Sequence, residues 1–364
     1  MPSGITVTAG NEFDSLWLVK GTIVEESSLT PSPMAPVTNP RVLFAKIPKD
    51  FPVPGETTVY DTTQTIDLES VPLNGGFLLK TLVLSIDPYM RGRMREPEIE
   101  SYMPAYPLGE PPYEPRLAVG KYVYGIIPHQ AYNVTPSMEG LIFLEKNPML
   151  PWTVFLGAAG MPGLTAYCGW KEFSKAKKGE TAFVTTGAGP VGSMVIQLAK
   201  RDGLKVIASA GSDAKVEFMK EIGADVAFNY KTTNTRDVLA REGPIDVFWD
   251  NVGGEMLEAA LDHANINGRF LECGFISAYN TDEQGIKNFG QVFGKSLQIF
   301  GILVLRLGQK YATEFYQEIP SAIASGELKY SEDASHGLGT VGDVILRVQK
   351  GWNNGKTVVI VADE

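Results

Sequence analysis

The 364-residue chain contains few of the side chains that proteins use to bind metals. Its only cysteines are Cys168 and Cys273, and its only histidines, His129, His263 and His336, stand far apart in the sequence. Zinc sites need three or four Cys, His or acidic ligands, usually with short spacings between them. The sequence therefore predicts no metal site. It also favours two reduced, packed thiols over a disulfide.

Positive charge and long apolar runs are also scarce. With 32 Lys and Arg against 42 Asp and Glu, the net charge is −10, which disfavours binding to a phosphate backbone. The most apolar run, Leu297–Leu305, is much shorter than the roughly 20 residues of a membrane span. A basic segment followed by an apolar one is absent near the N-terminus. We therefore expect a cytosolic protein with neither a nucleic-acid partner nor a membrane span.

The length of the chain is sufficient for two domains, each with a core of its own. Before about residue 155, short β-like runs such as Gly76–Ile86 and Lys121–Ile127 are interrupted by proline and glycine, which is typical of an irregular β domain. A last strand is expected at Thr357–Val361, and we expect it to rejoin that first domain.

The middle of the chain has a different pattern, in which apolar β-branched runs alternate with helical patterns. Strands are predicted at Thr181–Thr185, Lys205–Ser209, Asp225–Asn229, Ile245–Asp250, Arg269–Cys273 and Leu297–Val304, and helices at Val191–Arg201, Ala214–Glu221 and Thr313–Ala324. Alternating strands and helices predict a parallel sheet. The fold class is therefore α/β, with a Rossmann-type doubly wound sheet.

A glycine-rich turn, Gly187-Ala188-Gly189-Pro190-Val191-Gly192, lies between the first of these strands and the first helix. In that position glycines allow the backbone to approach a pyrophosphate at the N-terminus of a helix. A tight strand-to-helix connection has the same composition. Both interpretations remain open for the motif taken alone.

The end of the second predicted strand indicates which dinucleotide is bound. NAD-binding proteins place an acid there for the ribose 2′-hydroxyl, but here the chain reads Ala208-Ser209-Ala210-Gly211-Ser212. Small residues leave room for a 2′-phosphate, and Lys215 lies within reach in the next helix. NADP is therefore favoured over NAD. Alternatively, Lys215 is an ordinary solvated lysine in a helix that Ser212 caps.

Four motifs together resemble one family. They are Asp87-Pro88-Tyr89-Met90-Arg91-Gly92-Arg93-Met94, Gly160-Met161-Pro162-Gly163-Leu164-Thr165-Ala166-Tyr167, Asp250-Asn251-Val252-Gly253-Gly254 and Cys273-Gly274-Phe275-Ile276-Ser277-Ala278-Tyr279-Asn280. In this order they resemble the leukotriene B4 12-hydroxydehydrogenase / 15-oxoprostaglandin 13-reductase group, which includes the alkenal double-bond reductases. This group belongs to the zinc-independent medium-chain dehydrogenases/reductases.

The resemblance implies a fold, a cofactor and an activity. Residues 1–155 and 328–364 would form a GroES-like catalytic domain, and residues 156–327 a Rossmann domain that binds NADPH. The implied activity is NADPH-dependent reduction of the carbon–carbon double bond of a small enal or enone, commonly by a homodimer.

The resemblance also implies site residues. Contacts with NADPH would come from Met161, Thr165, Gly187, Gly189, Pro190, Val191, Gly192, Lys215, Tyr230, Asn251, Cys273, Gly274, Phe275, Ile276, Ser277, Ile302, Leu303, Val304 and Asn353. Tyr89 and Met90 are either one wall of an apolar substrate pocket or residues that pack between domains. Tyr230, Asn251 and Asn353 have simpler alternative roles as residues that cover a strand end or close a turn.

Three features depart from the family pattern. Gly187 and Pro190 replace the usual alanines of the glycine turn, which is expected to preserve the turn but to alter the entry into the helix. Ile302 replaces a common aromatic, so we expect a wider pocket. The stretch from Pro111 to Gly120 is shorter than its counterpart, as if a strand were trimmed.

Tyr279 is the candidate catalytic residue. Enone reduction develops negative charge on the carbonyl oxygen, and a phenol can donate a hydrogen bond to that oxygen and act as a general acid. Alternatively, the Tyr279 hydroxyl only ties down its loop.

The protein as a whole has two rival functions. They are a quinone reductase of the same fold and an NADPH-binding protein without turnover.

Overall fold

The computed structural model describes residues 35–111, 113–118, 122–145, 147–281 and 285–363, with residues 113–118 described by their backbone alone. Within these residues no helix is both long enough and apolar enough to cross a membrane. Two sequence predictions concern residues that are partly outside these ranges. The N-terminal segment and Lys121, the first residue of one predicted strand, lie outside the described residues.

A six-stranded parallel sheet confirms the predicted doubly wound fold. Its strands are β10 (Thr181–Val184), β11 (Lys205–Ala210), β12 (Val226–Asn229), β13 (Ile245–Asp250), β14 (Ala264–Glu272) and β15 (Gln298–Gly301). The order in the sheet is β12-β11-β10-β13-β14-β15. This is the strand order of dinucleotide-binding sheets. From β10 the chain adds strands first on one side, to β12, and then on the other side, from β13 to β15, so the order reverses between β10 and β13.

Two buried clusters cover the two faces of this sheet, as is usual for parallel strands. Ala182 and Val184 of β10 belong to one cluster, whereas Phe183 between them belongs to the other. The helices that connect or cover these strands are α2 (Met161–Gly169), α3 (Pro190–Arg201), α4 (Asp213–Glu221), α5 (Thr235–Glu242), α6 (Gly254–His263), α7 (Gln291–Gly294) and α8 (Val304–Ala324). Of these, α2 packs against both α3 and α8.

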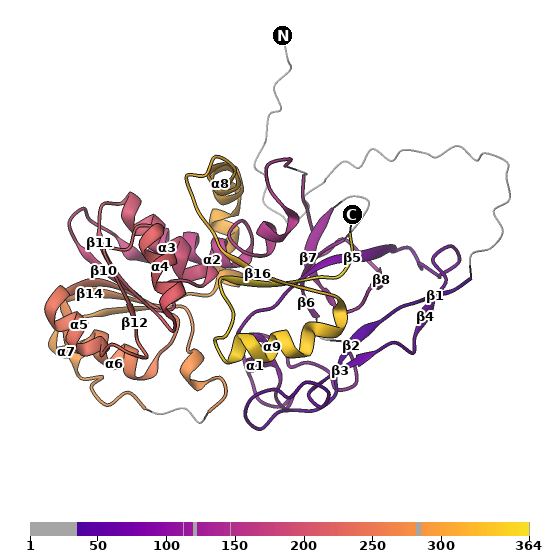
Figure 1. The fold of residues 1–364 in the computed structure, drawn as a ribbon, viewed down its shortest axis with the longest axis horizontal. Helices are drawn as coiled ribbons and strands as arrows, with labels where there is room; N and C mark the ends of the chain where they lie inside the picture. Colours follow the sequence, from indigo (N-terminus) through magenta and orange to yellow (C-terminus); the bar gives the residue numbers. More distant parts are fainter. Residues whose placement is uncertain (1–34, 112, 119–121, 146, 282–284, 364) are drawn as a thin grey trace, which may run out of the picture. The chain divides into compact units, whose positions relative to one another are not determined.

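A second, mainly antiparallel sheet forms the predicted β domain. Its strands are β5 (Phe77–Ser85), β6 (Tyr113–Ala118), β7 (Val123–Pro128), β8 (Tyr132–Thr135), β9 (Ile142–Phe143), β16 (Glu332–His336) and β17 (Lys356–Ile360). Strand β17 pairs with β5, so the end of the chain rejoins the first domain as expected (Figure 1). The segment from Pro111 to Gly120 retains a strand, β6, which pairs with both β5 and β7.

Short elements complete the described chain. They are β1 (Val37–Thr38), β2 (Arg41–Phe44), β3 (Thr58–Asp61), β4 (Thr65–Ile66), α1 (Met90–Arg93), η1 (Trp152–Leu156), η2 (Trp170–Ser174), η3 (Ile276–Ala278), η4 (Leu338–Thr340) and α9 (Val341–Gln349). Helix α1 follows β5 directly, and α9 precedes β17.

Two predicted strand boundaries are wrong. The strand predicted to begin at Arg269 begins at Ala264. The strand predicted to end at Val304 ends at Gly301, and α8 begins at Val304 rather than at Thr313. The apolar run is continuous across this junction, so its composition alone does not separate a short edge strand from the first turn of a helix.

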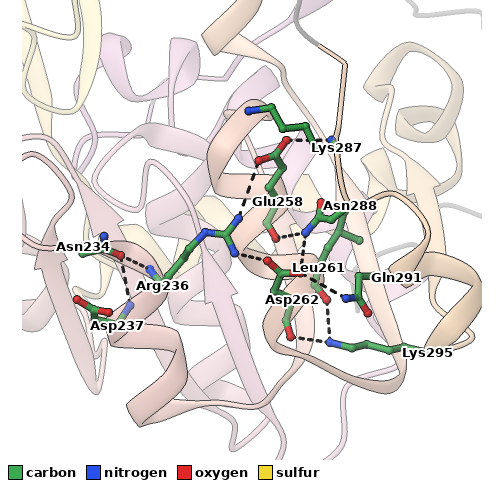
Figure 2. A network of polar contacts seen from close by, with 10 residues as sticks. All are labelled: Asn234, Arg236, Asp237, Glu258, Leu261, Asp262, Lys287, Asn288, Gln291 and Lys295. Carbon is green, nitrogen blue, oxygen red and sulfur yellow. Dashed lines mark hydrogen bonds and ion pairs between the residues drawn. The ribbon is translucent and has the colours of Figure 1, made fainter.

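A network of polar side chains ties α5 and α6 to the segment that leads into α7. Figure 2 shows the Arg236 guanidinium between the carboxylates of Glu258 and Asp262, with which it forms ion pairs. From the following segment, Asn288 Nδ2 donates to Asp262 Oδ1 over 2.8 Å, and Lys295 Nζ donates to the Leu261 carbonyl over 2.8 Å. These contacts anchor the chain between the loop after β14 and the edge strand β15.

Candidate active site

A cavity of about 510 Å³ opens at the carboxyl ends of β10, β13, β14 and β15. This includes the point where the strand order reverses, the usual ligand site of such sheets. Predicted residues that line the cavity are Tyr89, Met161, Thr165, Gly189, Pro190, Val191, Gly192, Asn251, Cys273, Gly274, Ile276, Tyr279, Ile302, Leu303 and Val304. The structure therefore gathers most of the predicted site in one place.

The glycine turn forms one end of this cavity. A Cβ atom on Gly192 would lie 2.4 Å from the Thr186 carbonyl oxygen, so only glycine fits where helix α3 meets the turn. Gly187 packs behind the turn, where a Cβ atom would lie 2.6 Å from Met219 Sδ. Gly189 lines the cavity, and a Cβ atom there would be crowded, since it would lie only 3.3 Å from the Thr186 carbonyl oxygen. The turn thus presents backbone and a helix N-terminus to the cavity, which suits an anionic pyrophosphate.

Pro190 does not disturb the entry into the helix. It occupies the first turn of α3, after an extended Gly189 at the N-cap. Proline suits this position because its fixed φ is helical and the amide N–H it lacks would have had no partner within the helix.

The turn after β13 forms the adjoining wall. Asn251 Nδ2 donates to the Thr185 carbonyl over 2.7 Å, and the Asn251 amide donates to Thr185 Oγ1 over 2.8 Å. The side chain therefore joins the ends of β10 and β13 while it lines the cavity. Asn251 thus serves as a structural turn residue whether or not it also contacts a cofactor.

Two carboxyl groups lie beneath this turn. Asp250 is completely buried and accepts hydrogen bonds from the amides of Val252, at 2.8 Å, and Gly253, at 3.0 Å. Its register partner on β14 is Glu272. Burial, together with the charge of Asp250, raises the pKa of Glu272 to about 9, so Glu272 holds a proton at neutral pH. Sequence reasoning missed this pair because each acid stands alone in its own strand.

The loop after β14 brings Tyr279 to the cavity. Its hydroxyl oxygen accepts a hydrogen bond from the Phe275 amide at 3.4 Å, the loop-tying contact expected of a structural tyrosine. That bond leaves the hydroxyl proton for another acceptor. Burial raises the pKa of Tyr279, so the phenol stays protonated at neutral pH and remains a donor.

Two predicted residues of the same loop face away from the cavity. The Phe275 ring lies over Gly253, where a Cβ atom would fall 1.9 Å from the ring. Ser277 Oγ lies 3.2 Å from the corresponding position on Gly254. Both side chains therefore cover the turn after β13.

Met90 does not belong to the substrate wall. It is fully buried in a core cluster with Leu84 and Ile86, and its sulfur accepts a hydrogen bond from the Asp87 amide at 3.4 Å. Helix α1 directs Met90 inward, whereas Tyr89 lines the cavity. Tyr89 thus lines the cavity, whereas Met90 packs in the core of its own domain, which is neither the substrate wall nor the packing between domains that was expected.

The apolar walls include residues that sequence reasoning missed. They are Tyr102, Met103, Tyr124, Ile126 and Ile142 from the β domain, and Leu164, Leu305, Ala312 and Tyr316 from α2 and α8, with the polar Gln309 of α8 beside them. Ile302, where an aromatic was expected, is buried and lines the cavity between these groups. Leu164 lies in the second of the four family motifs, but no local motif marks the others, because the fold brings them together from distant segments.

A cationic cluster lies beside the end of β11, outside the cavity lining. Lys215 Nζ donates to the Gly351 carbonyl over 2.9 Å, and repulsion from Lys231 helps burial to lower the Lys215 pKa. A Cβ atom on Gly211 would lie 3.0 Å from Tyr230 Oη and 3.2 Å from Lys231 Cε. The alternative role for Lys215, a solvated lysine in a helix that Ser212 caps, requires a capping bond from the Ser212 side chain. That side chain makes no such bond. Lys231 is the member that sequence reasoning missed.

Asn353 closes its own turn. Its Nδ2 donates to the Gly355 carbonyl over 2.9 Å, as the turn alternative predicts. It nevertheless lies two residues from Gly351, the partner of Lys215, and therefore borders the cationic cluster.

Metal-binding side chains do not gather in the described part of the chain. Among the residues placed by the structure, no three His, Cys, Asp or Glu side chains are close enough to hold a metal ion. Cys168 and Cys273 are both free, and burial raises the pKa of Cys273 to about 12. The strand order and the cavity at its reversal point are those of a dinucleotide-binding protein.

Comparisons with known proteins narrow this class. Residues 190–321 match a family described as zinc-binding dehydrogenase. The chain is 37% identical to an NADP-dependent oxidoreductase, RED1, of Cochliobolus heterostrophus, covering 89% of this chain and 98% of that protein. It is 35% identical to an NADP(+)-dependent 2-alkenal reductase of Nicotiana tabacum, with coverage of 90% and 99%.

A solved structure is similar as well. The crystal structure of CurA from Vibrio vulnificus in complex with NADPH superposes with a TM-score of 0.81 at 28% identity, covering 89% of this chain and all of that one. This protein belongs to the zinc-independent medium-chain dehydrogenases/reductases, in the group of NADP-dependent alkenal and enone double-bond reductases.

Proposed function

We propose that this protein uses NADPH to reduce the α,β carbon–carbon double bond of enals and enones. The observation that carries the proposal is the composition of one cavity. Its lining combines a glycine turn suited to a pyrophosphate, apolar side chains, and Tyr279, whose phenol stays protonated. An apolar conjugated carbonyl compound fits such walls.

The residues present suit NADPH. Gly189, which lines the cavity, and the N-terminus of α3 would hold the pyrophosphate. Lys215 and Lys231, two lysines that repel each other next to the Tyr230 hydroxyl, would pair with the 2′-phosphate. When bound, NADPH supplies the hydride that adds to the β-carbon.

Tyr279 would stabilise the charge that develops on the substrate. As the β-carbon is reduced, negative charge moves to the carbonyl oxygen, and the enolate must then take up a proton at the α-carbon. The Tyr279 hydroxyl proton, unused in the bond from the Phe275 amide, can be donated to that oxygen. In a water-poor cavity a donor of this kind removes the need for a metal ion.

Two rival functions share the same cofactor residues, namely a quinone reductase and an NADPH-binding protein without turnover. Following NADPH absorbance with a simple enone, an enal or a quinone as the sole acceptor separates them. We expect consumption with the enone and the enal. Consumption with the quinone alone would support the first rival, and no consumption with any acceptor would support the second.

The division into domains belongs to the same proposal. Residues 156–327 would form the NADPH-binding domain, and residues 1–155 with 328–364 the GroES-like catalytic domain. All six parallel strands fall within the first range, while β16 and β17 belong to the sheet of the second.

A homodimer is the expected assembly. Strand β15 lies at the edge of the parallel sheet, so one side of its backbone has no partner strand in the described residues. Exposed apolar side chains surround this edge, namely Ile299, Phe293, which is 91% exposed, and Ile266. An exposed apolar edge strand favours pairing with a second copy.

A cytosolic location is also part of the proposal. A fluorescent fusion that spreads through the cytosol would support that location.

A further inference from the structure

Two buried amide side chains, Asn280 and Gln349, join distant parts of the site. They are 7% and 6% exposed, respectively. Asn280 Nδ2 donates to Gln349 Oε1 over 2.9 Å, and Gln349 Nε2 donates to the Pro88 carbonyl over 2.9 Å. Because polar groups removed from water are costly unless paired, this connected set fixes its members firmly.

Arg91 completes the arrangement on the other side of Asn280. Its Nε donates to Asn280 Oδ1 over 3.1 Å, and its guanidinium also donates to the carbonyls of Asp50, over 3.0 Å, and Pro48, over 3.2 Å. Both polar atoms of the Asn280 side chain are therefore engaged. The loop that carries Asn280 is thereby bonded to α1 and to α9.

The position of this bridge relates it to the chemistry. Asn280 directly follows Tyr279, and Pro88 directly precedes Tyr89. Tyr279, Pro88 and Tyr89 all line the cavity. The bridge therefore connects the loop after β14 of the parallel sheet to the segment after β5 of the antiparallel sheet, next to residues from both segments that line the cavity.

We propose that Asn280 and Gln349 are positioning residues that hold Tyr279 at a fixed place relative to the Pro88–Tyr89 wall. A substrate lying against that wall then presents its carbonyl oxygen to the Tyr279 hydroxyl. The inference rests on the proposed role of Tyr279. Donors stabilise a developing oxyanion only when they are held in place, and misplacement by about 1 Å costs on the order of a hundredfold in rate.

A double-mutant cycle separates positioning from a general structural role. Gln349→Met keeps the length of the side chain and removes both hydrogen bonds. In single-turnover reduction of a small enone, we expect Tyr279→Phe to lose about ten- to a hundredfold in rate and Gln349→Met roughly five- to twentyfold. In the Tyr279→Phe background, Gln349→Met should cost less than about twofold, since no donor remains to be positioned. NADPH dissociation should stay within a few-fold throughout.

Gln197→Met is the matched control. Gln197 is also buried, and its Nε2 donates to the Lys329 carbonyl over 2.9 Å, away from Tyr279. The Gln197→Met variant should lower the thermal midpoint about as much as Gln349→Met does. It should leave the single-turnover rate unchanged. In cofactor-free protein, amide exchange at Phe275, whose N–H donates to Tyr279, should quicken in Gln349→Met but not in the control.

The outcomes are distinct. An unchanged rate in Tyr279→Phe overturns the catalytic role of Tyr279 and the inference with it. Two other outcomes overturn the positioning role of the bridge alone, and both require that Tyr279→Phe slows the single-turnover rate. In the first, Gln349→Met leaves that rate unchanged. In the second, the rate losses of the two single variants multiply in the double variant. If Gln349→Met gives no folded protein, Asn280→Ser removes the same bond from the other side, together with the bond from Arg91, and leaves Gln349 bonded to Pro88. The same cycle is expected for this variant.

Discussion

Lys356 Nζ donates a hydrogen bond to Asp87 Oδ1 over 2.5 Å, in an ion pair whose side chains are only 2% and 6% exposed. Ser85 Oγ donates to the second Asp87 oxygen, and Lys356 also donates to the Ile86 carbonyl over 3.1 Å. The pair joins β17, near the end of the chain, to the segment that enters the Tyr89 wall. The position of the Tyr89 wall therefore depends on the packing of β17 against β5.

Lys356→Met should be strongly destabilising, because it leaves the Asp87 carboxylate buried without a cation. Removing one partner of a buried pair costs about 3 to 5 kcal/mol, and Asp87→Asn in the same chain should restore part of that loss. Urea unfolding measures both. Lys46→Met, at an exposed pair with Glu56, is the control and should leave the midpoint nearly unchanged. Equal effects at Lys356 and Lys46 would show that burial of the pair has no energetic consequence.

Glu272→Gln should change how stability depends on pH. An unfolded glutamate ionises near its ordinary pKa of 4.5, whereas in the folded protein burial and the Asp250 charge raise the Glu272 pKa to about 9. Between these values the folded protein holds a proton that the unfolded chain has lost, so stability falls as pH rises. Glutamine does not titrate. The thermal midpoint of the variant should therefore match that of the unmodified protein near pH 4.5 and exceed it increasingly up to about pH 9.

Thermal unfolding of both proteins from pH 4.5 to 9 tests this dependence. Parallel pH curves would mean that Glu272 ionises in the folded protein as it does in the unfolded chain, and the raised pKa of Glu272 would then be wrong.

Lys215→Ala should weaken NADPH binding about ten- to a hundredfold, because one charge-assisted hydrogen bond contributes roughly 1.5 to 3 kcal/mol. NADH binding should hardly change, since it lacks the 2′-phosphate. Adding Lys231→Ala should weaken NADPH binding further and still spare NADH. Fluorescence titration with each cofactor gives the dissociation constants. If NADPH and NADH weaken equally, Lys215 acts only through its bond to Gly351.

The parts of this protein that follow local patterns could be predicted from the sequence. The parallel strands and the glycine turn each depend on residues close together in the chain, and the structure contains each of them, with marked boundary errors only at β14 and β15. The pair Asp87 and Lys356 stands 269 residues apart, and Asn280 and Gln349 stand 69 apart. Such contacts depend on tertiary packing, which also decides that Met90 points into the core while its neighbour Tyr89 does not.

Phe293→Asp should disrupt the proposed dimer. Phe293 is 91% exposed beside the edge strand β15, so a carboxylate there costs the free chain little but would have to be desolvated when two copies pair. Light scattering after size exclusion should show a dimer for the unmodified protein and a monomer for the variant. Met149→Asp, at a 71% exposed apolar side chain far from this edge in the sequence, is the control. A variant that remains dimeric would place the interface elsewhere.

The fate of the hydride tests the proposed reaction most directly. The protein is given an α,β-unsaturated ketone and NADPH deuterated at the transferable position, and the product is examined by NMR. Reduction of the conjugated double bond predicts a saturated ketone with deuterium at the β-carbon. An allylic alcohol with deuterium at the former carbonyl carbon would contradict the proposed function, because the hydride would then have been delivered to the carbonyl group.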